Sequence, residues 1–206
     1  MSIDAYIALR NRAGSLPDLG DYHSRAAEMN PAIFERFIKE MKDTGLLGVV
    51  WEPFAGTSYS HSLANSYAQD SAKRNDIELI SHGLAPRDSR IRAKDSTIEG
   101  PGKRIGGMLF HPPYPGSMPL SGHLCELSRK ENWSWEWYTE SLRKTIRLAK
   151  DSMIPGGLVC AVGSDYSVYS ERIRLGHLYL SLFESEGFIL WKVWLSLPDV
   201  VQIYKI

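Results

Sequence analysis

Hydrophobic and polar positions along the chain follow two different periods, one typical of helices and one of strands. A helix is predicted from Asn30-Pro31 to Gly45, because an N-cap residue and a first-turn proline open the segment and a glycine closes it. Its predicted buried face comprises Ile33, Phe34, Phe37, Ile38 and Met41. The short apolar run LLGVVW that follows is predicted to be a buried strand.

The same alternation of apolar runs and amphipathic segments continues to the end of the chain. Strands are predicted at IELIS, in a short segment ending near Asp95, at IGGMLF and at LVCAVGS. Three helices are predicted as well. The segment AGTSYSHSLANSYAQDS has only a weak helical pattern, whereas WSWEWYTESLRKTIRLAKDSM is a long helix that the following PGG is expected to stop. The third predicted helix is RIRLGHLYLSLFESEG. The last two apolar segments, FILWKVWLSL and VVQIYKI, predict a hairpin.

Strands that alternate with helices predict an α/β fold, because parallel neighbouring strands need crossover connections. We therefore expect a mainly parallel, Rossmann-like sheet with helices on both faces, and a closing hairpin that places one antiparallel strand at or near the edge. In such sheets ligands bind outside the carboxyl ends of the strands, near the topological switch point. Residues that directly follow the strands are the candidates for function.

Length and charge narrow the interpretation. A chain of 206 residues is one ordinary domain, which we divide into an N-terminal arm or cap over residues 1–21 and the domain proper over 22–206. Neither a signal-peptide core nor a membrane-spanning run is expected, which predicts a cytoplasmic protein. Lys and Arg total 24, as do Asp and Glu, so nucleic acid would bind only through local patches.

Cysteine and histidine spacing gives no sign of a metal centre. Cys125 and Cys160 form no CxxC pair and lie in unrelated contexts, so neither a zinc site nor a disulfide framework is expected. The six histidines also lack metal-ligand spacing: His23, His61, His82, His111, His123 and His177. We predict a protein without a metal.

Two strand ends carry polar or glycine-rich sequence that suggests chemistry. VVWEPFAGTSYS has a glycine after a strand, which lets the backbone approach a ligand, but no lysine follows it as a P-loop requires. GGMLFHPPYPG ends a buried strand with two prolines, which cannot extend a sheet ladder and so stiffen the loop. One rigid loop that combines an imidazole, main-chain carbonyls and an aromatic face can hold a flat polar group.

The pair Glu52 to Gly56 (EPFAG) and His111 to Tyr114 (HPPY), in this order on successive strands, resembles the DNA methyltransferases that modify amino groups. Their motifs read DPFxGSG and (D/N/S)PPY, and a subset has histidine first in the second motif, followed by an acidic residue, Leu and Ser, as at Glu126-Leu127-Ser128. YHSRAAEMNPAIFERFI and PGGLVCAVGSDY are also similar to segments of that family. The resemblance therefore extends from Tyr22 to the C-terminus.

The resemblance implies S-adenosylmethionine as the cofactor and assigns residues to bind it. Its amino-acid end would contact the loop of Glu52, Pro53, Phe54 and Gly56, although a solvated loop acid is the plain alternative for Glu52. Where the family has an acid for the ribose hydroxyls this chain has Ser81-His82-Gly83, so Ser81 or His82 would take that place. Asp95 would accept from the adenine amino group, or simply pair with Arg92 or Lys94.

For the target base, the resemblance assigns catalysis to the loop His111, Pro112, Pro113 and Tyr114. His111 would accept from the target amine if its imidazole is neutral, or be a structural ring in an inactive relative, and Tyr114 would stack on the base. Substrate contacts are expected from Ser164 and Asp165, for which a plain turn is the alternative, and from Trp133. Two of Trp133, Trp135 and Trp137 are expected to pack in the core. The basic residues are expected to be solvated rather than bound to phosphate: Arg87, Arg90, Arg92, Lys94, Lys103 and Arg104.

These features together predict a methyltransferase that modifies adenine N6 or cytosine N4 in DNA, with the base flipped or in a single strand. Nearly every segment belongs to the predicted sheet and its helices, which leaves no separate target-recognition domain. Selectivity would then be weak or come from a partner subunit, and a homodimer is the other expected assembly. Two alternatives stay open: an inactive methyltransferase-like subunit that acts as a scaffold, and methylation of RNA or a small molecule.

Overall fold

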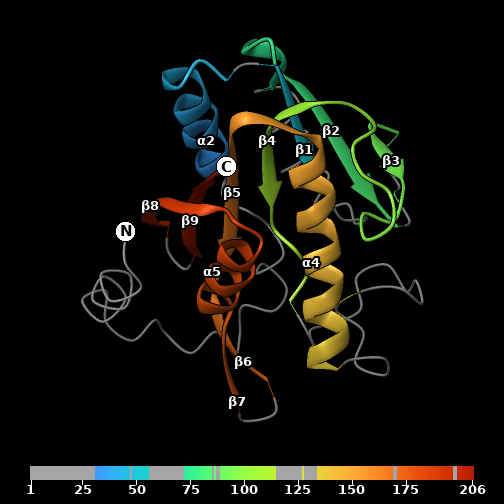
Figure 1. Cartoon of the computed structure of the whole chain (residues 1–206), viewed down its shortest axis with the longest axis vertical. Coiled ribbons are helices and arrows are strands. Elements are labelled where there is room, and N and C mark those ends of the chain that lie inside the picture. The colour runs from blue at the N-terminus through green and yellow to red at the C-terminus, as the bar shows by residue number, and fades with distance from the viewer. Residues whose placement is uncertain are drawn as a thin grey trace.

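A computed structural model describes residues 31–46, 48–55, 72–84, 86, 89–114, 127, 134–168, 171–196 and 199–206, without the side chains of 31, 166–168 and 171. The predicted N-terminal arm, the helix-capping Asn30, the glycine Gly56 with the weak helix after it, and Trp133 lie outside the described residues. The remaining elements are described below by the labels of Figure 1.

Seven strands form one sheet in the order β3-β2-β1-β4-β5-β9-β8. The strands are β1 (Val49–Glu52), β2 (Glu78–Gly83), β3 (Ile91–Ala93), β4 (Ile105–Phe110), β5 (Met153–Gly163), β8 (Ile189–Ser196) and β9 (Asp199–Lys205). The pairs within β3-β2-β1-β4-β5 are parallel, whereas β9 is antiparallel to both β5 and β8. The predicted mainly parallel sheet with a closing antiparallel hairpin is confirmed.

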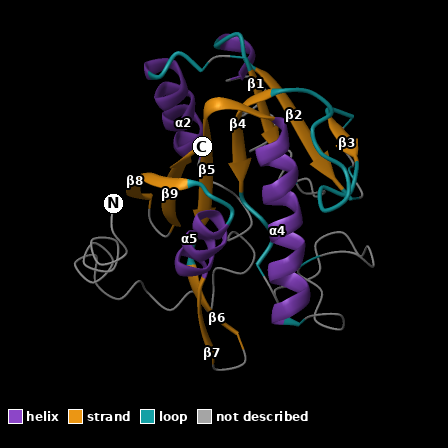
Figure 2. Cartoon of the chain, viewed as in Figure 1, coloured by secondary structure: helices purple, strands orange, loops and turns teal. Residues whose placement is uncertain are grey.

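Alternate residues of the central strands point to opposite faces of the sheet, as strand geometry requires. Trp51, Met108 and Val159 belong to a core cluster with α4 (Trp135–Ser152) and α5 (Leu175–Ser185). Val50, Leu109 and Cys160 belong to a second cluster with α2 (Pro31–Asp43). Helices therefore cover both faces, and Figure 2 shows α4 and α5 packed side by side on one of them.

Helix α2 packs closely on β4, and this explains the two glycines that open the strand. The predicted apolar face of α2 is buried throughout. A Cβ atom added at Gly107 would lie 2.7 Å from Met41 Sδ and 3.0 Å from Phe37 Cζ. One at Gly106 would lie 3.2 Å from the Leu46 carbonyl oxygen. The sequence GGMLF thus has small residues where the helix lies nearest to the strand.

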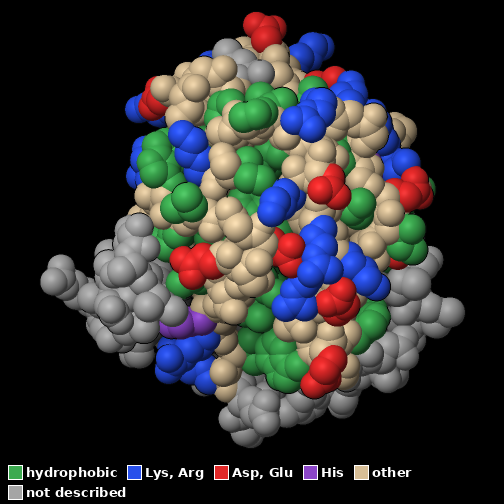
Figure 3. Space-filling view, viewed as in Figure 1, with side chains coloured by type: hydrophobic (Ala, Val, Ile, Leu, Met, Phe, Trp, Pro, Cys, Tyr) green, Lys and Arg blue, Asp and Glu red, His purple; other side chains and the backbone are tan. Residues whose placement is uncertain are grey.

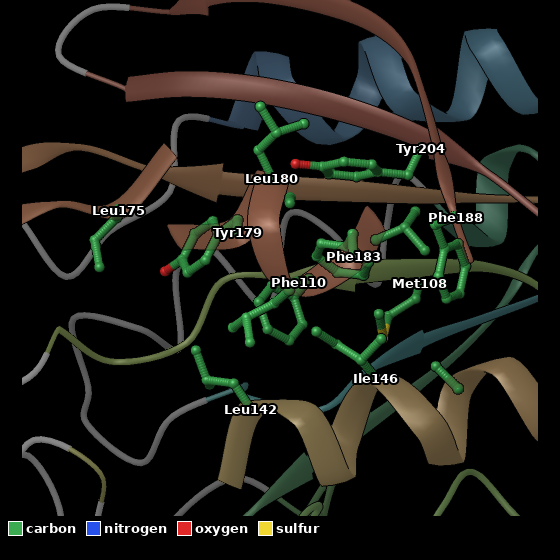
Figure 4. Packing of buried hydrophobic residues seen from close by; sticks show 14 of the residues in the cluster. Met108, Phe110, Leu142, Ile146, Leu175, Tyr179, Leu180, Phe183, Phe188 and Tyr204 are labelled. Carbon is green, nitrogen blue, oxygen red and sulfur yellow. The ribbon is translucent and has the colours of Figure 1, made fainter. Parts of the chain in front are cut away.

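On the other face, large aromatic side chains fill the space between α5 and the sheet (Figure 4). The Phe183 ring stacks on Tyr204 with centroids 4.4 Å apart, and it meets Phe110 edge to face at 5.1 Å. Tyr179 contacts Phe110 at 5.4 Å from the same helix. These contacts fix the end of β4, which is where the HPPY loop begins.

The prediction that PGG stops the long helix was wrong in its detail. Helix α4 ends at Ser152, and β5 starts at once at Met153, before Pro155 and the glycines. Ile105 pairs with Met153 and Gly107 pairs with Leu158, so β5 has several more residues than β4 over this interval. The extra residues bulge out of the ladder, and Gly156 adopts a φ of +79° that favours glycine.

The prediction of one helix from Arg172 onward was also wrong at its start. The segment Glu171–Arg174 is strand β7, which pairs antiparallel with β6 (Asp165–Val168), and α5 begins only at Leu175. Ile173 is buried between exposed Arg172 and Arg174, which is the period of a strand. Figure 1 shows this hairpin projecting from the end of the sheet toward which β4 runs.

In the part of the chain that the structure describes, no helix combines the length and apolar character needed to cross a bilayer. The same residues contain no group of three or more His, Cys, Asp and Glu side chains that could hold a metal ion.

Cys160 is a buried free thiol, and burial raises its pKa above the ordinary value.

Candidate active site at the carboxyl edge of the sheet

The two loops singled out in the sequence emerge side by side from the sheet. Strand β1 pairs with β4 in parallel, with Val50 opposite Gly107 and Trp51 opposite Met108. Phe54, after β1, meets Phe110, at the end of β4, with ring centroids 5.5 Å apart. In the strand order the chain turns from one half of the sheet to the other between β1 and β4, which makes this edge the topological switch point.

Glu52 is a buried acid at the end of β1. Only 7% of the residue is exposed, and Ser81 Oγ donates a 2.7 Å hydrogen bond to its Oε2 from the neighbouring strand β2. Burial raises the pKa of Glu52 to about 7, while the bond from Ser81 acts in the opposite direction. The alternative of a solvated loop acid is therefore wrong, and the carboxyl group lies where a bound cation would favour its ionised form.

His82, also at the end of β2, is fully buried. Trp51 Nε1 donates to its Nδ1 at 3.2 Å, so Nε2 carries the hydrogen of the neutral ring. Burial, with Lys94 and Arg92 nearby, lowers the pKa of His82 to about 4. Its Nε2 has no hydrogen-bond partner in the described structure, which leaves one buried donor at this strand end.

Ser96 ties three elements together beneath these residues, and sequence reasoning did not select it. Its Oγ donates to the Pro53 carbonyl oxygen at 2.7 Å and lies 3.4 Å from His82 Nδ1. Its own carbonyl accepts from Thr145 Oγ1 of α4 at 3.0 Å. The order Asp-Ser-Thr was a visible turn signal, but the partners of Ser96 lie far away in the sequence.

Asp95 caps the turn that contains Ser96. Its Oδ1 accepts from the Thr97 amide at 2.9 Å and from Thr97 Oγ1 at 2.7 Å. Lys94, considered above as a partner for Asp95, instead pairs with Glu99 at 2.5 Å. The third-strand acid therefore has a structural role through one of its two oxygens.

The loop after β4 is anchored by its second proline. Tyr138, from the first turn of α4, donates its hydroxyl hydrogen to the Pro113 carbonyl oxygen at 3.2 Å. Ser134 stabilises the start of that helix by accepting from the Trp137 amide at 3.1 Å. No described residue bonds the Pro112 carbonyl, which is the preceding acceptor in the loop.

Tyr114, the last residue of the loop, is anchored through its hydroxyl. The Ser164 amide, just after β5, donates to this oxygen at 3.0 Å, and the hydroxyl bonds the Asp199 carboxyl at the start of β9. Ser164 Oγ donates to Asp199 Oδ1 at 2.6 Å. Ser164 thus lies beside the loop, and Asp199, which the sequence analysis did not select, joins it because its partners are distant in sequence.

His111 is half-buried at the start of the loop. Its ring meets the Tyr114 ring edge to face, with centroids 6.2 Å apart. Asp165, the other predicted substrate contact, is 8% exposed and has Arg172 Nη2 at 3.6 Å from its Oδ2. The structure thus brings His111, Tyr114 and Ser164 together and places Asp165 next to Ser164.

The described tryptophans near this loop pack against the edge of the core. Trp135 and Trp137 are half-buried and pack against the cluster that contains Phe110 and Tyr138. Trp135 meets Tyr138 at 6.2 Å between ring centroids. The expectation that two of the three tryptophans pack in the core agrees with this placement.

Most described basic side chains near the sheet have local partners rather than forming a bare patch. Lys103 contacts Glu78 at 2.8 Å, and Arg104 donates to the Asp151 carbonyl at 3.3 Å. Figure 3 shows basic and acidic side chains intermingled on the face that carries α4. There Arg147 pairs with Glu186 at 3.0 Å. Lys103 and Arg104 of the predicted basic stretch thus have partners within the protein.

Comparison with known proteins establishes the fold. No protein-family model matches the chain, and no curated protein matches its sequence. Among solved structures, the chain is similar to Burkholderia thailandensis 1,6-didemethyltoxoflavin-N1-methyltransferase, which contains bound 1,6-didemethyltoxoflavin and S-adenosylhomocysteine. The TM-score is 0.52 at 14% identity, over 100% of this chain and 90% of the other.

Two weaker structural matches come from other organisms. An S-adenosylmethionine-dependent methyltransferase from Clostridium acetobutylicum has a TM-score of 0.47 at 7% identity, over 87% of this chain and 93% of the other. TrmN from Thermus thermophilus has a TM-score of 0.44 at 13% identity, over 88% of this chain and 50% of TrmN. The fold assignment rests instead on the Burkholderia match and on the observed strand order, which together give this chain the Rossmann-like fold of class I methyltransferases.

Proposed function

We propose that this protein transfers a methyl group from S-adenosylmethionine to an exocyclic amino group of a nucleobase, adenine N6 or cytosine N4, in DNA. The proposal is carried by the adjacency of the loops after β1 and β4 at the switch point of the sheet. One loop contains a buried acid and the other a rigid set of hydrogen-bond acceptors beside an aromatic ring. Methyl transfer needs a donor site and a planar-amine site that open onto each other.

The residues at the ends of β1 and β2 fit a cationic nucleoside donor. In this proposal Glu52 holds the amino-acid end of the cofactor, because a bound ammonium group offsets the cost of ionising a buried carboxyl. Pro53 and Phe54 are assigned to the surrounding wall, and Gly56, assigned with them from the sequence, lies outside the described residues. The Nε2 of His82, a buried donor with no described partner, suits a ribose hydroxyl and takes the place of the usual acid.

The remaining cofactor contacts follow from hydrogen bonds already made. Ser81 orients Glu52 and reaches the ligand through it, since its hydroxyl donates to that carboxyl group. Asp95 uses Oδ1 for its turn, so the adenine amino group would be bound by Oδ2. When bound, the cofactor supplies an electrophilic methyl group on a sulfonium.

At the acceptor end, His111 and the Pro112 carbonyl are proposed to accept the two N–H bonds of the target amine. The Pro113 carbonyl is already bonded by Tyr138, which leaves Pro112 as the main-chain acceptor. Tyr114 stacks on the base, and Ser164 with Asp165 borders the base pocket; Trp133, assigned to the same pocket from the sequence, lies outside the described residues. These acceptors draw the amine nitrogen toward tetrahedral geometry. Its lone pair then projects out of the plane of the base, toward the methyl group.

The reaction is an in-line displacement in which nitrogen forms a bond to the methyl carbon as the bond from carbon to sulfur breaks. S-adenosylhomocysteine leaves, and the extra proton on nitrogen passes through neutral His111 to water. His111 can accept this bond only through an unprotonated ring nitrogen. Positioning supplies most of the rate, because the step needs no covalent intermediate on the protein.

The test combines calorimetry with methyl transfer. S-adenosylhomocysteine should bind, and tritiated S-adenosylmethionine should label single-stranded or duplex oligodeoxynucleotides, with N6-methyladenine or N4-methylcytosine found after digestion. His111→Ala should abolish labelling but retain ligand binding, and Glu184→Gln on the exposed face of α5 is the matched control. Ligand binding with no label in DNA, and label instead in RNA or a small molecule, would refute the substrate assignment.

A second function, an inactive subunit that supports an active methyltransferase, is favoured by the end of β2. This strand end has Ser81 and His82 where the family has an acid for the ribose. The Ser81 hydroxyl is already bonded to Glu52, and His82 is fully buried. Ser58, at the place of the family's second glycine, and the histidine at 111 point the same way. Absence of any S-adenosylhomocysteine binding by calorimetry would favour this function over catalysis.

A further inference from the structure

A buried polar cluster lies beside the proposed base pocket and joins three parts of the fold. It consists of Tyr114 from the loop after β4, Ser164 from the end of β5 and Asp199 from the start of β9. Ser164 is 2% exposed and Asp199 is 8% exposed. These side chains contact one another far from their sequence neighbours, so the cluster exists only in the folded chain.

Two partners hold the Tyr114 hydroxyl, and a further hydrogen bond holds one of those partners in place. The Ser164 amide donates to the phenol oxygen at 3.0 Å, and the phenol hydrogen is directed to the Asp199 carboxyl. Asp199 is held by Ser164 Oγ at 2.6 Å. Burial, followed by the charge of Asp199, raises the pKa of Tyr114 above its ordinary value, so the phenol stays a hydrogen donor.

The ring plane of Tyr114 is therefore set by groups outside its own loop. A phenyl ring held only by packing could rotate or tilt, whereas a ring bonded at its far end by two partners keeps one orientation. Since stacking depends on the position of the ring face, a displacement of about 1 Å in a site of this kind costs about 100-fold in rate.

We propose that Asp199 is a positioning residue for methyl transfer: through its bond to the Tyr114 hydroxyl, with Ser164 as bridge, it orients the ring on which the target base stacks. This inference rests on the proposed function, because it assigns Tyr114 to the base. Asp199 touches neither the base nor the cofactor in this scheme. It acts on the turnover of the acceptor and not on binding of the donor.

The decisive variants are Asp199→Ala, Asp199→Asn and Tyr114→Phe, assayed for kcat, for KM of the oligodeoxynucleotide and for binding of S-adenosylhomocysteine. Asp199→Ala and Tyr114→Phe should each lower kcat about 10- to 100-fold and leave the binding constant for S-adenosylhomocysteine within about twofold of wild type. Asp199→Asn retains an oxygen acceptor and should restore kcat to within about threefold. The double variant of Asp199→Ala and Tyr114→Phe should lose no more than the more impaired single variant, because each substitution removes the same contact between Tyr114 and Asp199.

Gln202→Met is the matched control, since it removes a buried hydrogen bond from the same strand, between Gln202 Nε2 and the Gly176 carbonyl at 3.1 Å. It should lower the urea midpoint without changing kcat. An equal loss of kcat in Gln202→Met and Asp199→Ala would overturn the proposal, as would multiplying losses in the double variant.

A readout independent of methyl transfer separates this inference from the proposed function. With ¹³C-labelled tyrosine, the ring signal that disappears in Tyr114→Phe should shift in Asp199→Ala and stay in place in Gln202→Met. A wild-type chain that methylates no nucleobase refutes the function, while the ring signal still tests the bond. If Asp199→Ala leaves that signal unmoved, Asp199 does not position Tyr114.

Discussion

Replacing Glu52 with glutamine should make the protein more stable at alkaline pH, although the change removes a residue of the proposed site. The Glu52 side chain is buried and receives one hydrogen bond, from Ser81 Oγ at 2.7 Å. Glutamine has nearly the same shape and retains an oxygen to accept that bond. The substitution therefore changes the ionisation at this position and little else.

The magnitude follows from the pKa of the buried carboxyl group. Its pKa rises from 4.5 to about 7 in the folded chain, and one pKa unit corresponds to about 1.4 kcal/mol. Because the folded protein binds this proton more tightly than the unfolded chain does, its stability falls as pH rises from about 4.5 to about 7. Above pH 7 the cost reaches about 3 kcal/mol.

Urea unfolding followed by tryptophan fluorescence at several pH values from 4.5 to 8.5 measures this cost. Glu52→Gln and wild type should unfold with nearly equal free energies at pH 4.5. By pH 8 the variant should be more stable by about 3 kcal/mol. Glu184→Gln, an exposed carboxyl on α5, controls for the change of side chain itself.

A difference between Glu52→Gln and wild type that does not vary with pH would refute this account of Glu52. So would a variant that is less stable than wild type at pH 8. If stability behaves as expected, the variant should also bind S-adenosylhomocysteine more weakly, because the ammonium partner is lost. A more stable protein with a weaker site would show that the buried acid is retained for function.

Three further predictions concern packing, loop anchoring and acid stability. Gly107→Ala should destabilise the fold by about 1 to 3 kcal/mol, because its Cβ atom would overlap α2, whereas Gly100→Ala, whose nearest contact would be 3.7 Å, should be neutral in the same urea titration. Tyr138→Phe should lower methyl transfer and cost about 1 kcal/mol by removing the bond to the Pro113 carbonyl; unchanged transfer would contradict the anchoring. The pKa of His82 is about 4, below its ordinary 6.5, so this residue destabilises the fold as pH falls from about 6.5 to 4. His82→Gln should remove up to about 3 kcal/mol of that loss, and equal acid slopes in variant and wild type would disprove it.

The sequence by itself determined the order of the main elements and the two strand ends that matter. The apolar face of α2, the buried run of β4 and the final hairpin are encoded by local periodicity, which a chain shows whether folded or not. Parallel strands end at the same edge of a sheet. For this reason Glu52, at the end of one strand, and His111, just after another, could be expected from the sequence to lie near each other.

Sequence patterns failed where the pairing partner decides the local structure. Arg172 to Arg174 read as the start of a helix, but pairing with β6 makes them a strand. Pro155 and Gly156 read as a stop, but the ladder with β4 resumes beyond a bulge. Short segments have weak intrinsic preferences, and tertiary contacts override them.

Only the tertiary structure decided the electrostatics of the site and its outer partners. The pKa of Glu52 is raised by burial, and the bond from the Tyr114 hydroxyl to Asp199 joins the loop after β4 to β9. No local pattern encodes such contacts, because hydrogen bonds and desolvation depend on distance in space and not on separation along the chain.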